Sequence, residues 1–170
     1  MAYATSSVLG VDFNNPSTTA LFTLGQHVLG SDGIEAVYVI ATGTLATGSL
    51  VSIQNQGTAV NPITAYLYAP TGVAGGGALG VVQTLIPQGQ YGWAMVKGQN
   101  LIIQTSGSLA PGAVVYGLSD TPGAFQAAAS SGTLAGVYIT TSGSTAGLIY
   151  TARGTLTYPR LVNAAATPLG

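Results

Sequence analysis

The feature that most limits the fold is the regular return of short β-type runs separated by glycine-containing turns. In residues 63–69 (ITAYLYA), apolar side chains alternate with threonine and tyrosine, the period of two of a half-buried strand. Similar runs occupy residues 35–42, 49–55, 79–86, 91–97, 100–105, 113–118, 134–141, 147–152 and 155–162. Runs of this length and spacing predict an all-β fold, a small β-barrel or β-sandwich of about 8–11 short antiparallel strands.

Helix has little room in this sequence. The best candidate is residues 124–131 (AFQAAASS), with Thr121-Pro122-Gly123 before it and Gly132 after it. These flanking residues limit a helix there to one or two turns, and a hairpin arm fits the same residues equally well.

One strand–turn–strand motif occurs twice. ATGTLATGSLV at residues 41–51 returns at residues 105–115 as TSGSLAPGAVV, with the shared skeleton Gly-x-Leu-Ala-x-Gly-x-x-Val. Gly48 and Gly112 are available for a positive φ at the turn. The repetition indicates either a duplication or one local solution used twice. It therefore suggests two similar hairpin-containing halves, about 21–86 and 87–163, within a β-domain of residues 21–163.

The two ends of the chain have a different character. Residues 1–20 have scattered apolar positions, an Asn-Asn-Pro break and no pairing turn, which predicts an extended N-terminal arm. Candidate partner contacts on this arm are Tyr3, Val8, Leu9, Val11 and Phe13. We expect the β-domain to fold without residues 2–19. We expect residues 164–170 to be a C-terminal tail.

Charge is the unusual part of the composition. Only 4% of the residues are Asp, Glu, Lys or Arg, against about 25% in a typical soluble domain. Three basic residues are too few for a nucleic-acid backbone, whose binding proteins make about 6–10 phosphate contacts, or for a polybasic membrane patch. Polar residues interrupt every apolar run before a membrane-spanning length, and the N-terminus lacks the features of a signal peptide. We therefore expect no nucleic-acid and no membrane partner, and a surface that largely faces other protein.

The sequence shows no catalytic, metal or cofactor site. Cysteine is absent, and His27 is the only histidine, with Ser31 and Asp32 close by at a probable turn rather than in a triad. Asp32 and Glu35 do not make a metal-ligand set or an evident acid–base pair. The run Gly75-Gly76-Gly77 lacks the Lys-Ser/Thr of a phosphate loop. Trp93 and the tyrosines could stack on a sugar or base, although packing in the sheet or at a subunit contact is the favoured interpretation.

Two segments resemble a known family. Residues 24–51 (LGQHVLGSDGIEAVYVIATGTLATGSLV) and 88–116 (QGQYGWAMVKGQNLIIQTSGSLAPGAVVY) resemble capsid decoration, or cement, proteins of tailed bacteriophages. The carrying motifs are the Gly-Ser-Asp-Gly turn, the Tyr-Gly-Trp strand and the Leu-Ala-Pro-Gly turn. The N-terminal arm and the triple-glycine run depart from the pattern.

The resemblance implies a non-enzymatic virion structural protein without a cofactor. Its partners would be the major capsid protein and itself, as a homotrimer. It would be made in the host cytoplasm and would bind the capsid exterior, stabilising contacts between capsomers. The alternative is a receptor- or glycan-binding module of a phage fibre or surface layer.

Overall fold

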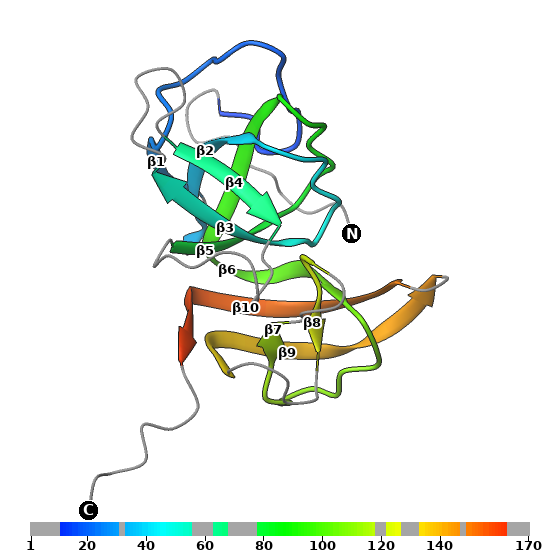
Figure 1. The fold of residues 1–170 in the computed structure, drawn as a ribbon. Helices are drawn as coiled ribbons and strands as arrows, with labels where there is room; N and C mark the ends of the chain where they lie inside the picture. The colour runs from blue at the N-terminus through cyan, green and yellow to red at the C-terminus, as the bar shows by residue number, and fades with distance from the viewer. Residues whose placement is uncertain are drawn as a thin grey trace, which may run out of the picture.

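The fold is all-β, as the sequence predicted. A computed structural model describes residues 11–30, 33–55, 63–67, 78–117, 122–126, 133–146 and 149–162. Every element named within them is a strand (Figure 1). The strands are β1 (His27–Leu29), β2 (Glu35–Ala41), β3 (Leu50–Asn55), β4 (Ile63–Leu67), β5 (Ala78–Val82), β6 (Tyr91–Thr105), β7 (Tyr116–Gly117), β8 (Phe125–Gln126), β9 (Thr133–Ala146) and β10 (Ile149–Val162).

Five strands close into a ring that we call the first barrel. Strand β2 pairs in parallel with β4, and β4, β3, β5 and the N-terminal part of β6 follow as antiparallel neighbours. The antiparallel pairing of β6 with β2, from Tyr91 opposite Ile40 to Lys97 opposite Glu35, closes the ring. Strand β1 adds to the start of β2 as an outer antiparallel strand. Of the two architectures predicted from sequence, the barrel is therefore correct.

A second ring repeats the same order of pairing. Strand β6 pairs in parallel with β8 at Thr105, and β8, β7, β9 and β10 follow as antiparallel neighbours. The antiparallel pairing of β10 with the C-terminal part of β6 closes this ring. Each strand of the second ring thus has a counterpart four strands earlier, and β6 belongs to both rings. Figure 1 shows the two rings as an upper and a lower lobe joined along β6.

The repeated motif has the same structural role in both rings. The Gly48 N–H donates to the carbonyl of Val82 on β5, and the Gly112 N–H donates to that of Ile139 on β9. Both glycines have a positive φ, 83° and 77°, so the turn needs the conformation that glycine adopts without strain. The leucine of each copy is buried, Leu45 in the first barrel and Leu109 in the second ring.

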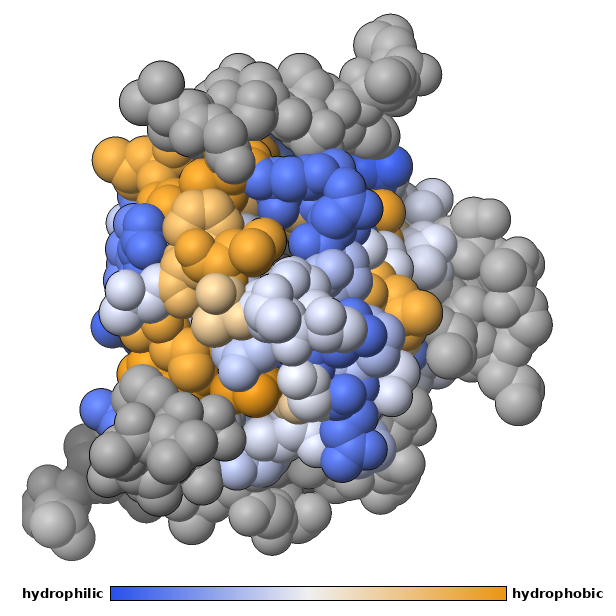
Figure 2. Space-filling view, turned by 90° about the horizontal axis from the view of Figure 1, so that it is seen from above, coloured by the Kyte–Doolittle hydropathy of each residue, from blue (hydrophilic) through white to orange (hydrophobic). Residues whose placement is uncertain are grey.

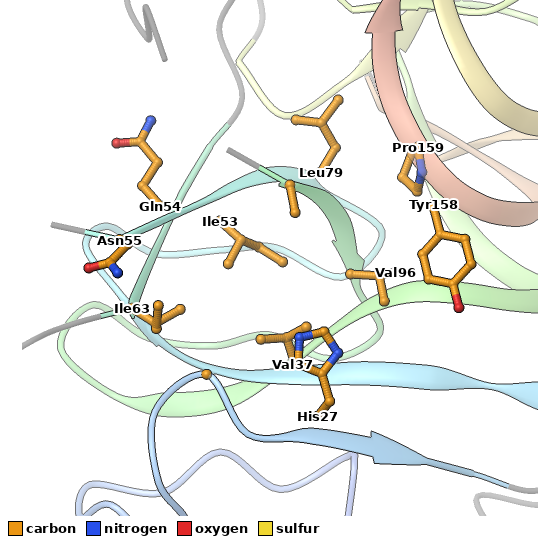
Figure 3. Close-up of a pocket in the computed structure, with 12 residues that line it drawn as sticks. His27, Val37, Ile53, Gln54, Asn55, Ile63, Leu79, Val96, Tyr158 and Pro159 are labelled. Atoms are coloured by element: carbon orange, nitrogen blue, oxygen red, sulfur yellow. The ribbon is translucent and has the colours of Figure 1, made fainter. Parts of the chain in front are cut away.

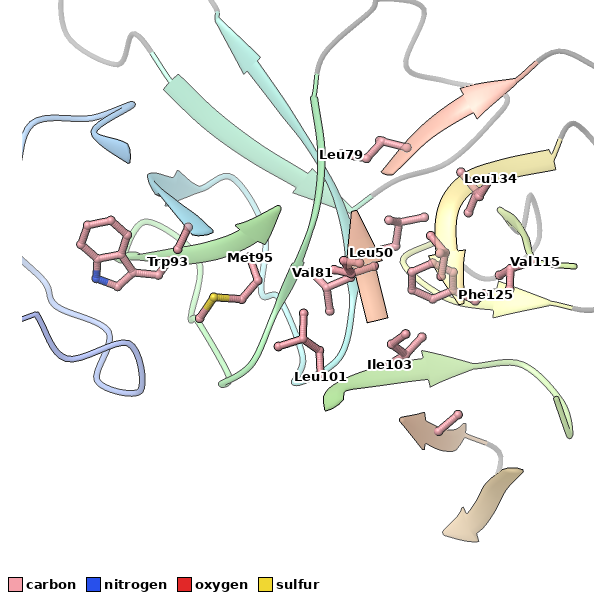
Figure 4. Packing of buried hydrophobic residues seen from close by; sticks show 14 of the residues in the cluster. Leu50, Leu79, Val81, Trp93, Met95, Leu101, Ile103, Val115, Phe125 and Leu134 are labelled. Atoms are coloured by element: carbon pink, nitrogen blue, oxygen red, sulfur yellow. The ribbon is translucent and has the colours of Figure 1, made fainter. Parts of the chain in front are cut away.

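Two hydrophobic clusters fill the fold. Alternate residues of β2 to β6, among them Val37, Val39 and Val96, point into the first barrel and form one cluster. The second cluster joins the inside of the second ring to the outer face of the first barrel. Figure 4 shows Leu50 and Val81, from that outer face, gathered with Ile103 and Phe125 of the second ring. The two rings therefore share one continuous core.

The N-terminal segment is part of this core from residue 11 onward. Val11 and Phe13 are 7% and 5% exposed, and the Phe13 ring meets Trp93 edge-on at 5.6 Å between centroids. Ser17 makes a β-bridge with Tyr91. The expectation that the β-domain folds without residues 2–19 stays a prediction, and such a truncation would remove the part of the core that Val11 and Phe13 fill.

Of the two interpretations left open for residues 124–131, the described part contradicts the helix and fits the hairpin arm, since Phe125 and Gln126 form β8. The remainder of that range lies outside the described residues. Two pairs of predicted strands merge into the long strands β6 and β10. Gly98 and Gly154, which fall between the predicted runs, lie inside continuous strands.

We predict that alanine at the two equivalent turn glycines has unequal effects. An added Cβ at Gly48 would lie 2.8 Å from the backbone nitrogen of Gln104, whereas at Gly112 nothing lies within 4 Å. Gly112→Ala should cost about 1–2 kcal/mol of stability from its left-handed φ alone. Gly48→Ala should cost more, because the backbone of β6 has to move. Urea unfolding of both variants checks this, and equal losses would contradict it.

Candidate functional site

Three polar side chains form a cluster where the first barrel meets β10. The Lys97 ammonium donates to Glu35 Oε1 at 2.8 Å, and the Tyr158 hydroxyl donates to Glu35 Oε2 at 2.5 Å. The Lys97 Nζ also lies 5.5 Å from the centre of the Tyr158 ring. Glu35 and Lys97 face each other across the β2–β6 pairing that closes the barrel. The cluster therefore ties this closure to β10 of the second ring.

The three groups of the cluster stabilise one another in the protonation states that form their hydrogen bonds. The hydrogen bond from Lys97, then that from Tyr158, lowers the pKa of the Glu35 carboxyl. The bond to Glu35 raises the pKa of both Lys97 and Tyr158. At neutral pH the carboxylate is ionised and the other two groups are protonated. Each of the three pKa shifts in this cluster moves away from neutrality.

A cavity of about 370 Å³ opens beside this cluster, at one end of the first barrel. Figure 3 shows Val37, Val96 and Ile53 at its floor, with His27 and Tyr158 on its rim. Its described lining is mostly apolar and consists of Gly25, His27, Val37, Ile53, Gln54, Asn55, Ile63, Ala78, Leu79, Val96, Tyr158 and Pro159.

The described surface carries several large apolar side chains. Leu21 and Leu29 are each 66% exposed, and both lie in the N-terminal segment that precedes β2. Figure 2, seen from above the first barrel of Figure 1, shows hydrophobic residues gathered in one zone of that face. On the second ring, Val114 and Tyr138 are 56% and 61% exposed. Such side chains on so weakly charged a chain suit contact with other protein.

Of His27, Ser31 and Asp32, for which the sequence predicted a turn and no triad, the structure places only His27. His27 lies exposed on β1 at the cavity rim, while Ser31 and Asp32 are outside the described residues. Glu35 is bound to Lys97 and Tyr158. The described part of the chain groups no three potential metal ligands, and it has no helix long and apolar enough to cross a membrane.

Trp93 is not a stacking platform. It is 2% exposed and packs against Phe13, Phe22 and Tyr38. The burial excludes the glycan-binding role considered for this residue and agrees with packing in the sheet. Its aromatic neighbours fasten the N-terminal segment to the barrel.

The arm residues divide into two groups. Val11 and Phe13, proposed from the sequence as partner contacts, are buried in the core of this chain and have no free surface for a partner. Tyr3, Val8 and Leu9 lie outside the described residues, as do the three glycines at 75–77. A truncation that tests the arm has to end before Val11.

The cluster and the cavity were not found from sequence. Glu35 and Lys97 are 62 residues apart, and Glu35 and Tyr158 are 123 apart, so no local spacing joins them. The one indication in the sequence was the scarcity of charge. Lys97 is the only charged residue in its strand, and a carboxylate is its most favourable neighbour in the fold.

Comparison with solved structures returns matches, among them a phage head fibre protein. No protein-family model matches this sequence. No curated protein matches it. The N base of the head fibre protein gp8.5 of bacteriophage phi29 aligns with a TM-score of 0.49 and 11% identity, covering 76% of this chain and 99% of that one. A likeness of this degree carries no functional argument, and the proposals below rest on this chain's own residues.

We predict that the polar cluster stabilises the fold in a pH-dependent way. Because the pKa of Glu35 is lowered in the folded state, its contribution is present above its unfolded pKa of about 4.3 and is lost as pH falls through the folded value. The stability difference between wild type and Glu35→Gln should therefore be larger at pH 7 than at pH 3. Tyr158→Phe, which keeps the ring, should show a smaller effect. A difference that does not change with pH would contradict the prediction.

Proposed function

We propose that this chain is a virion structural protein that decorates the exterior of a phage capsid and stabilises contacts between capsomers. The observation that carries the proposal is the pair Leu21 and Leu29, each 66% exposed on a chain with 4% charged residues. Contact with a partner would remove both leucines from water, which is favourable for apolar surface. The resemblance of residues 24–51 and 88–116 to decoration proteins supports the major capsid protein as the proposed partner.

The proposed attachment works through contact area and needs no reaction. A stable protein interface of standard size buries about 1,600 Å², and many copies on one lattice gain further from avidity. The barrel supplies a rigid support for the contact. Half-buried Phe22, Leu24 and Val28 pack against the core and hold the segment that carries the two leucines. No enzymatic activity, cofactor or nucleic-acid partner forms part of the proposal, and self-association is as a homotrimer.

The first test is the composition of the virus particle. Particles from the source are separated on a density gradient, and the chain is quantified by mass spectrometry. We expect it to band with DNA-filled virions at a copy number comparable to that of the major shell protein. A few copies per particle would favour the alternative, a fibre or receptor-binding module. Absence from particles would overturn both.

The second test concerns the attachment surface. The double variant Leu21→Asp and Leu29→Asp should fold normally, because both side chains are exposed, and should lose co-sedimentation with capsids lacking the native protein. Leu85→Asp is the matched control, since Leu85 is 51% exposed and lies in the connection between β5 and β6 rather than in the N-terminal segment. Unchanged co-sedimentation of the double variant, or equal loss in the control, would count against this surface.

A further inference from the structure

The repeat makes it possible to compare the two ends of the fold position by position. Val82 lies opposite Ala94 in the first barrel, and Ile139 lies opposite Gly154 in the second ring. The residue before each, Val81 or Tyr138, therefore has the same place in its ring. Leu50 and Val114 also correspond, because each lies two residues after the turn glycine of its motif.

These corresponding residues have opposite environments. Leu50 and Val81 are fully buried and belong to the core shared with the second ring. The Leu50 N–H donates to the carbonyl of Gly123, which precedes β8. Their counterparts Val114 and Tyr138, which we call the exposed pair, are 56% and 61% exposed. The face that the first barrel buries against the second ring is thus present again on the second ring, uncovered in the single chain.

The end of the second ring against which Leu50 and Val81 pack also has a counterpart in the first barrel. That end carries Leu101 and Leu156, which share the buried core with them. By register, Leu101 corresponds to Val37, because Leu101 faces Gly154 as Val37 faces Ala94. Leu156 likewise corresponds to Val96, two residues further along.

Both Val37 and Val96 line the cavity of about 370 Å³ in the first barrel. The second ring therefore has this end filled by the first barrel, while the same end of the first barrel keeps a cavity (Figure 3).

We propose that the exposed pair of one copy docks at the first-barrel cavity of a second copy, repeating between chains the packing that joins the two rings within one chain. Tyr138 would enter the apolar cavity beside His27, and burying an aromatic side chain removes about 150–250 Å² from water. The contact joins two different surfaces, so successive copies close into a ring or continue as a filament. Closure after three copies gives the homotrimer of the proposed function.

The inference deepens the proposed function by naming its self-association surface, and it is tested on purified protein without capsids. Sedimentation and light scattering over a range of concentrations should show an oligomer for the wild type. Tyr138→Asp should raise the dissociation constant by about 30-fold or more, the loss typical of a central interface side chain. Val114→Asp is a second variant of the same surface, and Leu85→Asp, exposed elsewhere, should leave the mass unchanged.

A mixing experiment tests that the two surfaces are different. His27→Trp fills the cavity rim, so it should dissociate the oligomer while leaving the exposed pair intact. Mixed with the Tyr138→Asp variant, the His27→Trp variant should form heterodimers and nothing larger. The intact exposed pair of the His27→Trp chain docks at the intact cavity of the Tyr138→Asp chain. The remaining pair and the remaining cavity are both altered, so no third chain can add. A monomeric wild type, variants of wild-type mass, or no heterodimer on mixing would overturn the proposal. A wild-type protein that forms the expected oligomer but does not bind capsids would overturn only the proposed function.

Discussion

The structure depends on one strand being shared by two closed rings. Strand β6 runs from Tyr91 to Thr105, and its first part closes the first barrel against β2 while its second part closes the second ring against β10. A barrel removes the unpaired edges that a sheet otherwise exposes. Here one strand removes edges in both rings, so the hydrogen bonds and the core of each ring hold the other in place. The Glu35–Lys97–Tyr158 cluster adds a polar tie at the crossing.

Much of the fold could be predicted from local pattern. Strands β2, β3 and β4 fall within two residues of the predicted runs, because each shows strand composition bounded by turns. The long strands were divided at Gly98 and Gly154. A glycine inside a strand pattern suggests a break, yet Gly154 lies where an added Cβ would meet the Ile103 side chain at 2.2 Å, so it leaves room for Ile103 in the interior of the second ring.

The rest could not be predicted, because it depends on contacts between distant residues. Strands β1 and β8 have three and two residues, too few for periodicity to detect. Val11 and Phe13 lie in an irregular segment, and their burial follows from the aromatic neighbours supplied by the barrel. The cavity follows from the register of five strands. Sequence identified the repeated turn correctly, but the difference in exposure between Val81 and Tyr138 appears only once the two rings are compared.

Because both rings use β6, the two rings form one after the other as the chain is synthesised. The first barrel can close as soon as Lys97 has left the ribosome, since β2 to β5 have already emerged. The remaining part of β6 then waits without its partners β8 and β10, and its pairing with β10 is complete only once Thr157 has been made. Unpaired strand edges are where folding intermediates aggregate. The half-made chain is thus most vulnerable after its first barrel is complete, and in this interval a chaperone would have the greatest effect on yield.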